Sequence, residues 1–342
     1  MGAFGDCREA SKRECFMNKE YRLEIADMDE KWDNFVQGSP NGTIYSSTKY
    51  LQASNIKYKL YYCYKKNELR AGVALIENET KDSTVLDDFV IYNGILYNKP
   101  TNNQNHAQQF SEQFKIQEFI ATELIKIYKK VQMRLHTSIV DIRAFLWVNY
   151  GENRPKYLPD IRYTTFVNIS DFRTVKKIDQ ISTYTRSSTS RRQQIRYALN
   201  KGYVTKCTED SQLFIELYEK TMNRQNIKIN ILKLQRMKSL IDVLLQANIG
   251  KIYANYDEFG KLGSMAVFAW DTKRAYYIFG ANNPQMRESH CGSSILWDAF
   301  YDLSNMGINE VDMEGINSPQ RGWFKLSFGG SIIPYYSMKY DS

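Results

Sequence analysis

Long apolar runs are missing from this sequence. No stretch of about 18 apolar residues occurs in its 342 residues, so no membrane-spanning helix is expected. The opening residues, MGAFGDCREASKRECF, are polar and lack the apolar segment of a secretory signal. Asp6 also stands where the myristoylation pattern requires serine or threonine. We therefore expect neither an export signal nor an N-terminal lipid.

Paired cysteines and metal-ligand clusters are missing too. Five cysteines are scattered along the chain with no CxxC spacing, and His106 and His136 have no companions at the spacing of a metal site. This pattern predicts reduced thiols, a cytoplasmic protein, no structural zinc and no catalytic metal.

What the sequence does contain is enough apolar and aromatic material for a folded protein. Hydrophobic residues make up 43% of it, with 25 tyrosines and 17 phenylalanines, so the chain is globular rather than disordered. Its net charge of +8 favours an anionic partner, which is a phosphate, a nucleotide, a nucleic acid or a lipid surface. Excess lysine that only keeps the surface soluble explains the charge equally well.

An internal repeat is the clearest organisational signal. Residues 61–76 (YYCYKKNELRAGVALI) and 252–268 (IYANYDEFGKLGSMAVF) both show an apolar strand, a charged turn and a second strand with a glycine near its start. These glycines are Gly72 and Gly263. Another strand-like segment, an amphipathic helix and a short segment with an aspartate (Asp141 or Asp312) follow each hairpin. The short segments are predicted to be strands.

Matched elements in the same order imply two similar α/β domains with a cleft between them. Each domain is expected to be a mixed β-sheet flanked by helices, in the α/β (α+β) class. We expect a flexible tail over residues 1–17, one domain over residues 18–170 and a second over residues 171–342.

A basic helix is predicted near the start of the second domain. Residues 190–193 (SRRQ) resemble a capping box, and Gly202 is expected to end the helix in the left-handed conformation. Arg191, Arg192 and Arg196 place guanidinium groups near a helix start, where spare amide donors favour an anion. The segment is therefore either a phosphate or RNA-backbone site or a solvated helix face.

A second helix start carries Gly292, Ser293 and Ser294. Such a start presents backbone amides to a phosphate or carbonyl of a ligand, although it is also an ordinary serine cap. His290 and Cys291 precede it, but adjacent residues rarely face each other as a nucleophile and its base.

Three charged residues near the C-terminus are candidates for chemistry. Asp312 and Glu314 are two apart on a predicted strand and are expected to point to one face, where they would bind or deprotonate an amine or pair with a basic side chain. Lys325 lies between Phe324 and Phe328, before a Gly-Gly pair that suggests backbone packed near a sheet. A buried ammonium group there needs a partner.

Together these segments resemble a known family. RRQQIRYALNKGY, ELYEKTMNRQ, SMAVFAW, GSSILWDAFYDLSNMGINEVDMEG and FKLSFGG are similar to segments of the Fem-type peptidoglycan-bridge transferases. They equally resemble the wider double-domain acyltransferases of the GNAT superfamily. WDNFVQGSPNGTIYSSTKYL and DDFVIYNGILY resemble parts of the family's first domain. The resemblance covers nearly the whole chain from about residue 20 and implies two tandem GNAT-like domains.

The resemblance also implies an activity and site roles. Lys325 and Phe324 would lie at the acyl carbonyl, where the ammonium group stabilises the developing oxyanion. Asp312 or Glu314 would orient or deprotonate the attacking amine. Arg191, Arg192 and Arg196 would face phosphates of donor or acceptor, and Gly292, Ser293 and Ser294 would form the coenzyme A loop. The alternative for Lys325 is an amphipathic lysine at a helix end, with its stem packed on Phe328.

The donor is left open by departures from the family pattern. Ser289 stands where the coenzyme A loop has Gln or Arg, which weakens an acyl-coenzyme A donor. Residues 211–246 show helices but no long arm, which weakens an aminoacyl-tRNA donor. No tightly bound cofactor is expected, and either donor would be a co-substrate.

The expected enzyme is an N-acyltransferase acting on an amine of a bacterial cell-envelope precursor, either a nucleotide-linked amino sugar, as in polysaccharide biosynthesis, or a peptidoglycan peptide. One alternative is a Fem-type aminoacyl-tRNA-dependent peptidyltransferase, with tRNA as a partner. An alternative of another class is a non-catalytic nucleotide- or RNA-binding module. DNA is not an expected partner, whereas peripheral contact with a membrane surface is compatible with the sequence.

Overall fold

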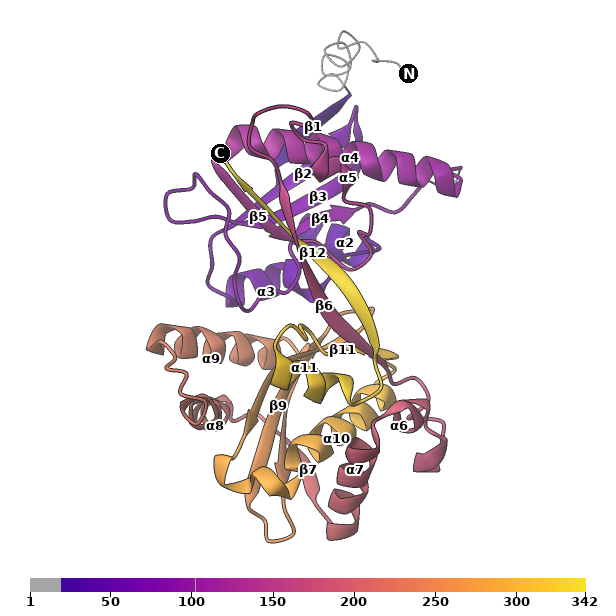
Figure 1. Cartoon of the computed structure of the whole chain (residues 1–342), viewed down its shortest axis with the longest axis vertical. Coiled ribbons are helices and arrows are strands. Elements are labelled where there is room, and N and C mark those ends of the chain that lie inside the picture. The colour runs from indigo at the N-terminus through magenta and orange to yellow at the C-terminus, as the bar shows by residue number, and fades with distance from the viewer. Residues whose placement is uncertain (1–19, 102) are drawn as a thin grey trace. The chain divides into compact units, whose positions relative to one another are not determined.

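The computed structural model describes residues 20–101 and 103–342 (Figure 1). The predicted tail at residues 1–17 lies outside them. The described chain forms two compact units, each containing sheet and helices, so the predicted mixed α/β class is confirmed. The first unit takes in residues up to 48, 56–161 and 335–342, and the second takes in residues 49–55 and 162–334. The domain division predicted at residues 170 and 171 stays a prediction.

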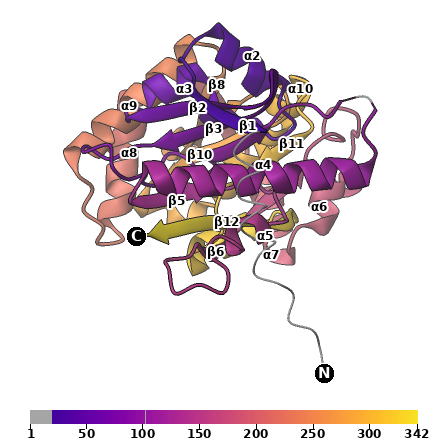
Figure 2. The same cartoon turned by 90° about the horizontal axis from the view of Figure 1, so that it is seen from above.

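The first unit is built on an antiparallel sheet in the order β1-β2-β3-β4. Its elements are α2 (Glu30–Gly38), β1 (Tyr21–Ile25), β2 (Tyr58–Lys65), β3 (Glu68–Ile76), β4 (Gly94–Tyr97), α4 (His106–Ile127), β5 (Lys130–Arg134) and α5 (Arg143–Leu146). Figure 2 shows α4 lying across the strands. Its buried residues Ile116, Ile120 and Leu124 pack into a core with strand residues such as Val73 and Ile95, which confirms the apolar face predicted for them. The same face was predicted to continue to Ile127 and Val131, but Ile127 is 46% exposed and Val131 lies in β5.

The second unit contains the strand order β6-β11-β10-β9-β8-β7. Its strands are β6 (Leu158–Asn168, shared with the first unit), β7 (Val204–Thr208), β8 (Gly250–Tyr256), β9 (Leu262–Trp270), β10 (Ala275–Asn282) and β11 (Glu310–Asp312). Its helices include α6 (Ser182–Arg186), α7 (Thr189–Lys201), α8 (Ser211–Asn223), α9 (Ile231–Gln246), α10 (Cys291–Asn305) and α11 (Pro319–Leu326). Figure 1 shows α8 and α9 on one side of β9, and α10 with α7 on the other.

Both predicted hairpins are present. β2 pairs with β3, and β8 pairs with β9, all antiparallel. The glycine near the start of each second strand lies where another side chain comes close. A Cβ on Gly72 would lie 3.1 Å from the Trp32 ring, and a Cβ on Gly263 would lie 2.6 Å from Cβ of Cys291. These glycines therefore allow a helix to pack closely on the strand.

The strand predicted to carry Asp141 is not there. β5 ends at Arg134, and Asp141 lies in the following loop, where its carboxylate accepts hydrogen bonds from Arg143 at 2.7 and 2.9 Å. The apolar run around Asp141 instead leads into the short helix α5, which buries Phe145. Asp312 does end a strand, so the prediction is correct only for the second repeat.

Two strands contain residues of both units. β6 begins in the first unit and ends in the second, while β12 (Ser331–Asp341) begins in the second and ends in the first. The last residues of β12 pair antiparallel with β5, for example Tyr340 with Val131. No helix among the described residues is long and apolar enough to cross a bilayer.

Candidate active site

Helix α7 begins two residues earlier than the predicted capping box. Ser188 is the N-cap, and its Oγ accepts a hydrogen bond from the Arg191 backbone amide at 3.2 Å. The box predicted for Ser190 and Gln193 is therefore wrong, because Ser188 provides the same oxygen one position before the helix. The predicted end is correct, since Gly202 has φ 72° in the left-handed region.

Arg191 is buried between α7, α10 and α11. Its guanidinium stacks 4.4 Å from the Phe324 ring centroid and 4.6 Å from that of Phe328. Its Nε donates to Ser327 Oγ at 2.8 Å, and Nη1 donates to Ser293 Oγ and to Gln194. Burial lowers the pKa of Arg191 to about 10, so the group stays charged at neutral pH. These contacts give Arg191 a role within the fold, while its role towards a phosphate stays a prediction.

The other two arginines of α7 are more accessible. Arg192 is half-buried, and its Nη2 lies 3.5 Å from Thr189 Oγ1 of the same helix. Arg196 is exposed one turn further along. Of the three predicted phosphate ligands, these two present their charge closer to solvent.

The start of α10 is tied to α7 through Ser293 and to β8 through Ser294. Ser293 Oγ donates to Gln194 Oε1 at 2.7 Å, and Ser294 Oγ accepts from Asn255 Nδ2 at 3.2 Å. Both serines are buried. Gly292 lies close to β10, because a Cβ there would be 2.7 Å from Asn282 Oδ1. The hydroxyl groups thus fix the helix start, and a ligand at this position would meet backbone rather than free serine side chains.

Cys291 and His290 do not form a nucleophile and base. Cys291 is buried, and burial raises the pKa of its thiol. The ring of His290 packs edge-on against Tyr197, with centroids 5.2 Å apart. A thiol with a raised pKa is a poor nucleophile at neutral pH.

Asp312 and Glu314 lie together, though not as predicted. β11 ends at Asp312, and Glu314 has φ 59° beyond the strand, so the two are not alternate residues of one strand. Asp312 is fully buried; its Oδ1 accepts from Thr164 Oγ1 at 2.5 Å and from the Glu314 amide at 2.8 Å. Asp312 therefore holds the backbone of Glu314 in a left-handed conformation that is uncommon for a residue with a side chain.

Lys325 lies next to these carboxylates. It is near the end of helix α11, and its Nζ donates to the Gly315 carbonyl at 3.2 Å. The same Nζ is 5.5 Å from the centroid of the Tyr277 ring. Burial lowers the pKa of Lys325, and the negative charges of Glu314 and Asp312 oppose that shift. Lys325 as a whole is half-buried, and its ammonium end has two carboxylates as charge partners, as the sequence led us to expect of a lysine in apolar surroundings.

The glycines after Lys325 pack as expected from the sequence. A Cβ on Gly330 would lie 2.8 Å from the Phe166 carbonyl of β6, and one on Gly329 would lie 2.6 Å from the Arg186 backbone. The Gly-Gly pair therefore brings the chain against the sheet immediately after α11.

Tyr277 is a residue of this cluster that the sequence did not indicate. Its hydroxyl lies against Gly280, and burial together with Glu314 raises the pKa of Tyr277. In the sequence Tyr277 appears only as part of a Tyr-Tyr pair on a predicted strand. The neighbouring residues do not indicate that this strand lies close to Lys325.

The cluster forms where two parallel strands separate. β10 and β11 pair only through Ala275 with Val311 and Tyr276 with Asp312. From Tyr277 to Asn282, β10 has no β11 partner among the described residues, and its pairing with β9 shifts register between Tyr277 and Phe279. This edge of β10 can pair with an extended ligand that carries amide groups, and Lys325 and Glu314 lie beside its start.

Comparisons with known proteins identify part of the chain. A family model described as "Acetyltransferase (GNAT) domain" matches residues 188–321. Residues 188–321 are therefore similar to a GNAT acetyltransferase domain. The GNAT domain runs from the cap of α7 into α11 and contains Arg191, Gly292, Asp312 and Glu314; Phe324 and Lys325 lie just beyond the matched residues. A search of curated proteins by sequence gives no significant match.

Solved structures show the same fold over nearly the whole chain. A crystal structure of FemX matches with a TM-score of 0.61 and 12% identity, covering 92% of this chain and 96% of that one. The L-PGS structure from Bacillus licheniformis matches with a TM-score of 0.55 and 12% sequence identity, covering 93% of this chain and 93% of that one. A tandem GNAT protein from the clavulanic acid biosynthesis pathway matches with a TM-score of 0.51 and 8% sequence identity, covering 94% of this chain and 98% of that one. The predicted tandem GNAT-like fold and the resemblance to Fem-type and double-domain GNAT proteins are confirmed.

The GNAT domain also settles the class of protein. The chain is an acyltransferase, and the prediction that it is an enzyme of this class is confirmed. The alternative of a non-catalytic nucleotide- or RNA-binding module has no comparable support.

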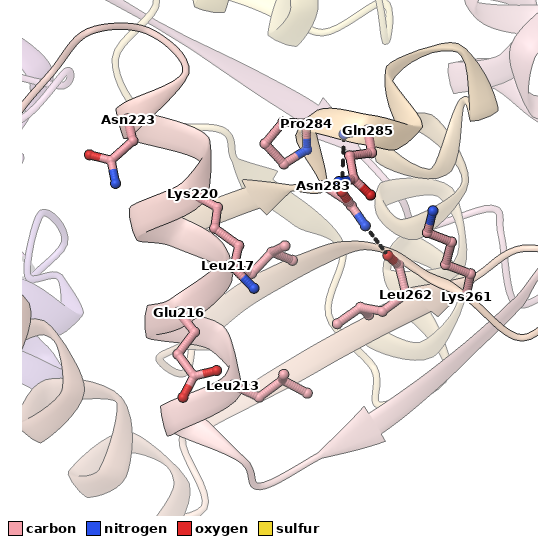
Figure 3. A pocket seen from close by; sticks show the side chains of 10 residues that line it. All are labelled: Leu213, Glu216, Leu217, Lys220, Asn223, Lys261, Leu262, Asn283, Pro284 and Gln285. Atoms are coloured by element: carbon pink, nitrogen blue, oxygen red, sulfur yellow. Dashed lines mark hydrogen bonds between the residues drawn. The ribbon is translucent and has the colours of Figure 1, made fainter.

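A pocket of about 520 Å³ lies within the residues that match the GNAT model (Figure 3). It is bounded by α8, by the start of β9 and by the segment after β10. Asn283 fixes its rim, donating to the Leu262 carbonyl at 2.9 Å and accepting from the Gln285 amide at 3.0 Å. Lys220 and Lys261 line it from opposite elements, together with Glu216. None of the residues predicted for catalysis lines this pocket.

Proposed function

We propose that this protein is an N-acyltransferase that moves an acyl group from a coenzyme A thioester to an amine of a bacterial cell-envelope precursor. The acceptor would be a nucleotide-linked amino sugar, as in polysaccharide biosynthesis, or a peptidoglycan peptide, and the reaction would take place in the cytoplasm. The buried Lys325 ammonium beside Glu314 and Tyr277, at the separation of β10 and β11, is the observation that supports the proposal most directly.

The chemistry needs no covalent enzyme intermediate. The amine nitrogen attacks the thioester carbonyl carbon, the carbon–sulfur bond breaks, and the thiolate of coenzyme A leaves and takes up a proton. Lys325 stabilises the negative charge on the carbonyl oxygen during attack. Phe324, next to Lys325, forms part of the acyl site.

Glu314 is the better placed of the two carboxylates to take the proton from the amine. Asp312 is fully buried and already accepts hydrogen bonds from Thr164 and from the Glu314 amide, so it acts as a positioning residue. Arg192 and Arg196 bind phosphates of the donor or the acceptor, with Arg191 behind them. The start of α10 at Gly292, Ser293 and Ser294 receives the donor diphosphate through its backbone.

The Fem-type reaction is the second candidate. FemX shares the fold over 92% of this chain. The resemblance of the sequence to Fem-type enzymes implies an aminoacyl-tRNA donor. The α8–α9 pair would be the element that contacts tRNA, but these helices span only Ser211–Asn223 and Ile231–Gln246. This shortness favours the coenzyme A donor.

The test supplies both donors to the full chain. Radiolabelled acetyl-coenzyme A and aminoacyl-tRNA are each incubated with UDP-linked amino sugars and with UDP-linked muramyl peptide, and transfer of label to the acceptor is measured. We expect transfer from acetyl-coenzyme A together with release of free thiol. Transfer from charged tRNA alone would replace our proposal with the Fem-type reaction.

Replacement of Lys325 tests the role of its charge. Lys325→Met is expected to lower kcat by about 10²–10³-fold, the loss seen when one oxyanion-stabilising donor is removed. Lys339→Met, which removes an exposed lysine of β12, is the matched control and should leave kcat unchanged. Equal rates for Lys325→Met and the wild type would exclude Lys325 from the reaction.

A further inference from the structure

The connection between α8 and α9 exposes aliphatic side chains. We call residues 220–232 the α8–α9 tip; it lies at the edge of the second unit in Figure 1. Ile227 is 42% exposed, and Ile231 and Leu232, the first two residues of α9, are each 63% exposed. Three large aliphatic residues within six positions are thus exposed to solvent. Their exposure is unfavourable relative to burial, in proportion to the apolar area left in water.

Ile231 extends the apolar face of α9 past the residues of that face that are buried against the rest of the second unit. Leu234, Met237 and Ile241 are buried, and Ile231 lies one turn before Leu234 on the same side of the helix. The helix start is well defined, because Asn230 Oδ1 accepts a hydrogen bond from the Leu232 amide at 2.9 Å. The tip therefore holds Ile231 and Leu232 outward on an ordered helical turn.

The charged residues within the tip are all basic, although Glu219 precedes it and Lys238 of α9 is paired with Asp242. Between Glu219 and Asp242 the chain has six basic residues and no acidic one. At the tip itself Lys220, Arg224 and Lys228 are exposed. An apolar protrusion surrounded by cations matches a bilayer surface, whose anionic headgroups attract the cations while its acyl boundary accepts the aliphatic side chains.

We propose that the α8–α9 tip docks this protein on a membrane surface that carries anionic phospholipids. The alternative partner for a basic tip is RNA. No phenylalanine, tyrosine or tryptophan occurs between Tyr218 and Tyr253, so the tip lacks the rings on which unpaired bases stack, whereas its exposed aliphatic residues suit lipid. This interaction does not depend on the proposed acyl transfer, and it would place the enzyme beside membrane-linked acceptors.

The test measures binding of the full chain to lipid vesicles by co-sedimentation. Vesicles of phosphatidylcholine alone are compared with vesicles that also contain phosphatidylglycerol, at low and at high salt. We expect binding to the anionic vesicles at least about tenfold stronger than to the neutral ones, weakening as salt rises.

Two variants separate the apolar from the charged contribution. Ile231→Ser with Leu232→Ser should weaken binding to anionic vesicles by about tenfold or more. Lys220→Gln with Arg224→Gln and Lys228→Gln should weaken it similarly and remove most of the salt dependence. The matched control is Leu158→Ser with Ile161→Ser, which removes two aliphatic side chains that are 68% and 54% exposed elsewhere; it should bind as the wild type does.

The outcomes are distinct because binding is measured without acyl transfer. Thermal unfolding of each variant confirms that it is folded. The proposal is overturned if the wild type does not bind anionic vesicles, or if both tip variants bind as strongly as the wild type. It is also overturned if unacylated tRNA binds the wild type, the charge variant loses that binding, and vesicle binding is unaffected.

Discussion

Lys325 is the residue on which the proposed chemistry depends most. Helix α11 carries the side chain inward, and its ammonium group has the Gly315 carbonyl, Glu314 and Asp312 around it. Buried charges of this kind usually cost stability, and they persist where they serve a reaction. A lysine that is charged but poorly hydrated interacts more strongly with a developing oxyanion than a lysine in water does.

The pKa of Lys325 makes stability depend on pH in a definite direction. The folded-state pKa lies below the ordinary value of 10.5, so as pH rises between the two the unfolded chain binds more protons than the folded one. The free energy of unfolding of the wild type should therefore increase, relative to that of Lys325→Met, as pH approaches 10.5 from below. Urea denaturation of both proteins across this range measures the difference, and parallel curves would show that Lys325 is not buried in its charged form.

Arg191 and Arg196 should respond differently to substitution although both belong to α7. Arg191→Lys loses the stacking on Phe324 and Phe328 and the bonds to Ser327 and Ser293, so we expect a loss of about 2 kcal/mol in the free energy of unfolding. Arg196→Gln should change it by less than about 0.5 kcal/mol and instead raise KM for the phosphate-bearing substrate. Denaturant unfolding and steady-state kinetics distinguish the two, and the same stability loss in both variants would contradict this division.

Sequence reasoning could find the charged residues of the site but not all of their partners. Lys325, Asp312 and Glu314 were indicated by charges in apolar surroundings. Tyr277 and Thr164 come from strands distant in sequence, and only the pairing of β10 with β11 and of β11 with β6 brings them close. The left-handed backbone conformation of Glu314 could not be predicted either, because that position has neither glycine nor asparagine, the residues that usually adopt it.

At the scale of elements, the local patterns were reliable where turn chemistry and periodicity agreed. The two hairpins, the apolar faces of α4 and α10 and the end of α7 follow from such patterns. The prediction of a strand around Asp141 was wrong, because a short apolar run fits a strand and a helix equally well. Helix α11 begins with a proline and has only eight residues. This length is too short for a helical repeat of apolar residues to be recognised in the sequence.

The glycine of the second hairpin gives a test of how closely α10 packs on β9. Gly263→Ala would place a Cβ 2.6 Å from Cβ of Cys291, which neither residue can relieve by rotating a side chain, so we expect a loss of about 2 kcal/mol or more in the free energy of unfolding. Gly38→Ala, at the end of α2 with nothing within 4 Å, is the control and should have little effect. Thermal or denaturant unfolding measures both, and equal stabilities would mean that α10 can move away from the sheet.

At the scale of the whole molecule, the two units are not successive segments of sequence. β6 and β12 each contribute to both, and residues 335–342 return to the first unit. The repeat in the sequence indicated two domains, but it gave no sign of this exchange, because strand sharing depends on pairing between segments far apart in the chain.

This exchange predicts that the boundary at residue 171 cannot be used to isolate the second unit. A fragment of residues 171–342 lacks β6, which pairs with β11 through Asn168, Val167 and Phe166. It also lacks the core residues Val167, within β6, and Ile169, just after it. We expect it to be insoluble or to unfold without cooperativity. A fragment that begins at residue 158 restores β6 and should be measurably more ordered by circular dichroism. Cooperative melting of the shorter fragment would show that β6 is dispensable.

The return of β12 to β5 also has a consequence for biosynthesis. Lys130 and Asp341 form an ion pair across a separation of 211 residues, so the ribosome must add more than 200 further residues after β5 before the first unit can acquire its last strand. The first unit would stay incomplete while the second unit is synthesised, and a stop codon at residue 335 would damage the unit whose other strands were made first.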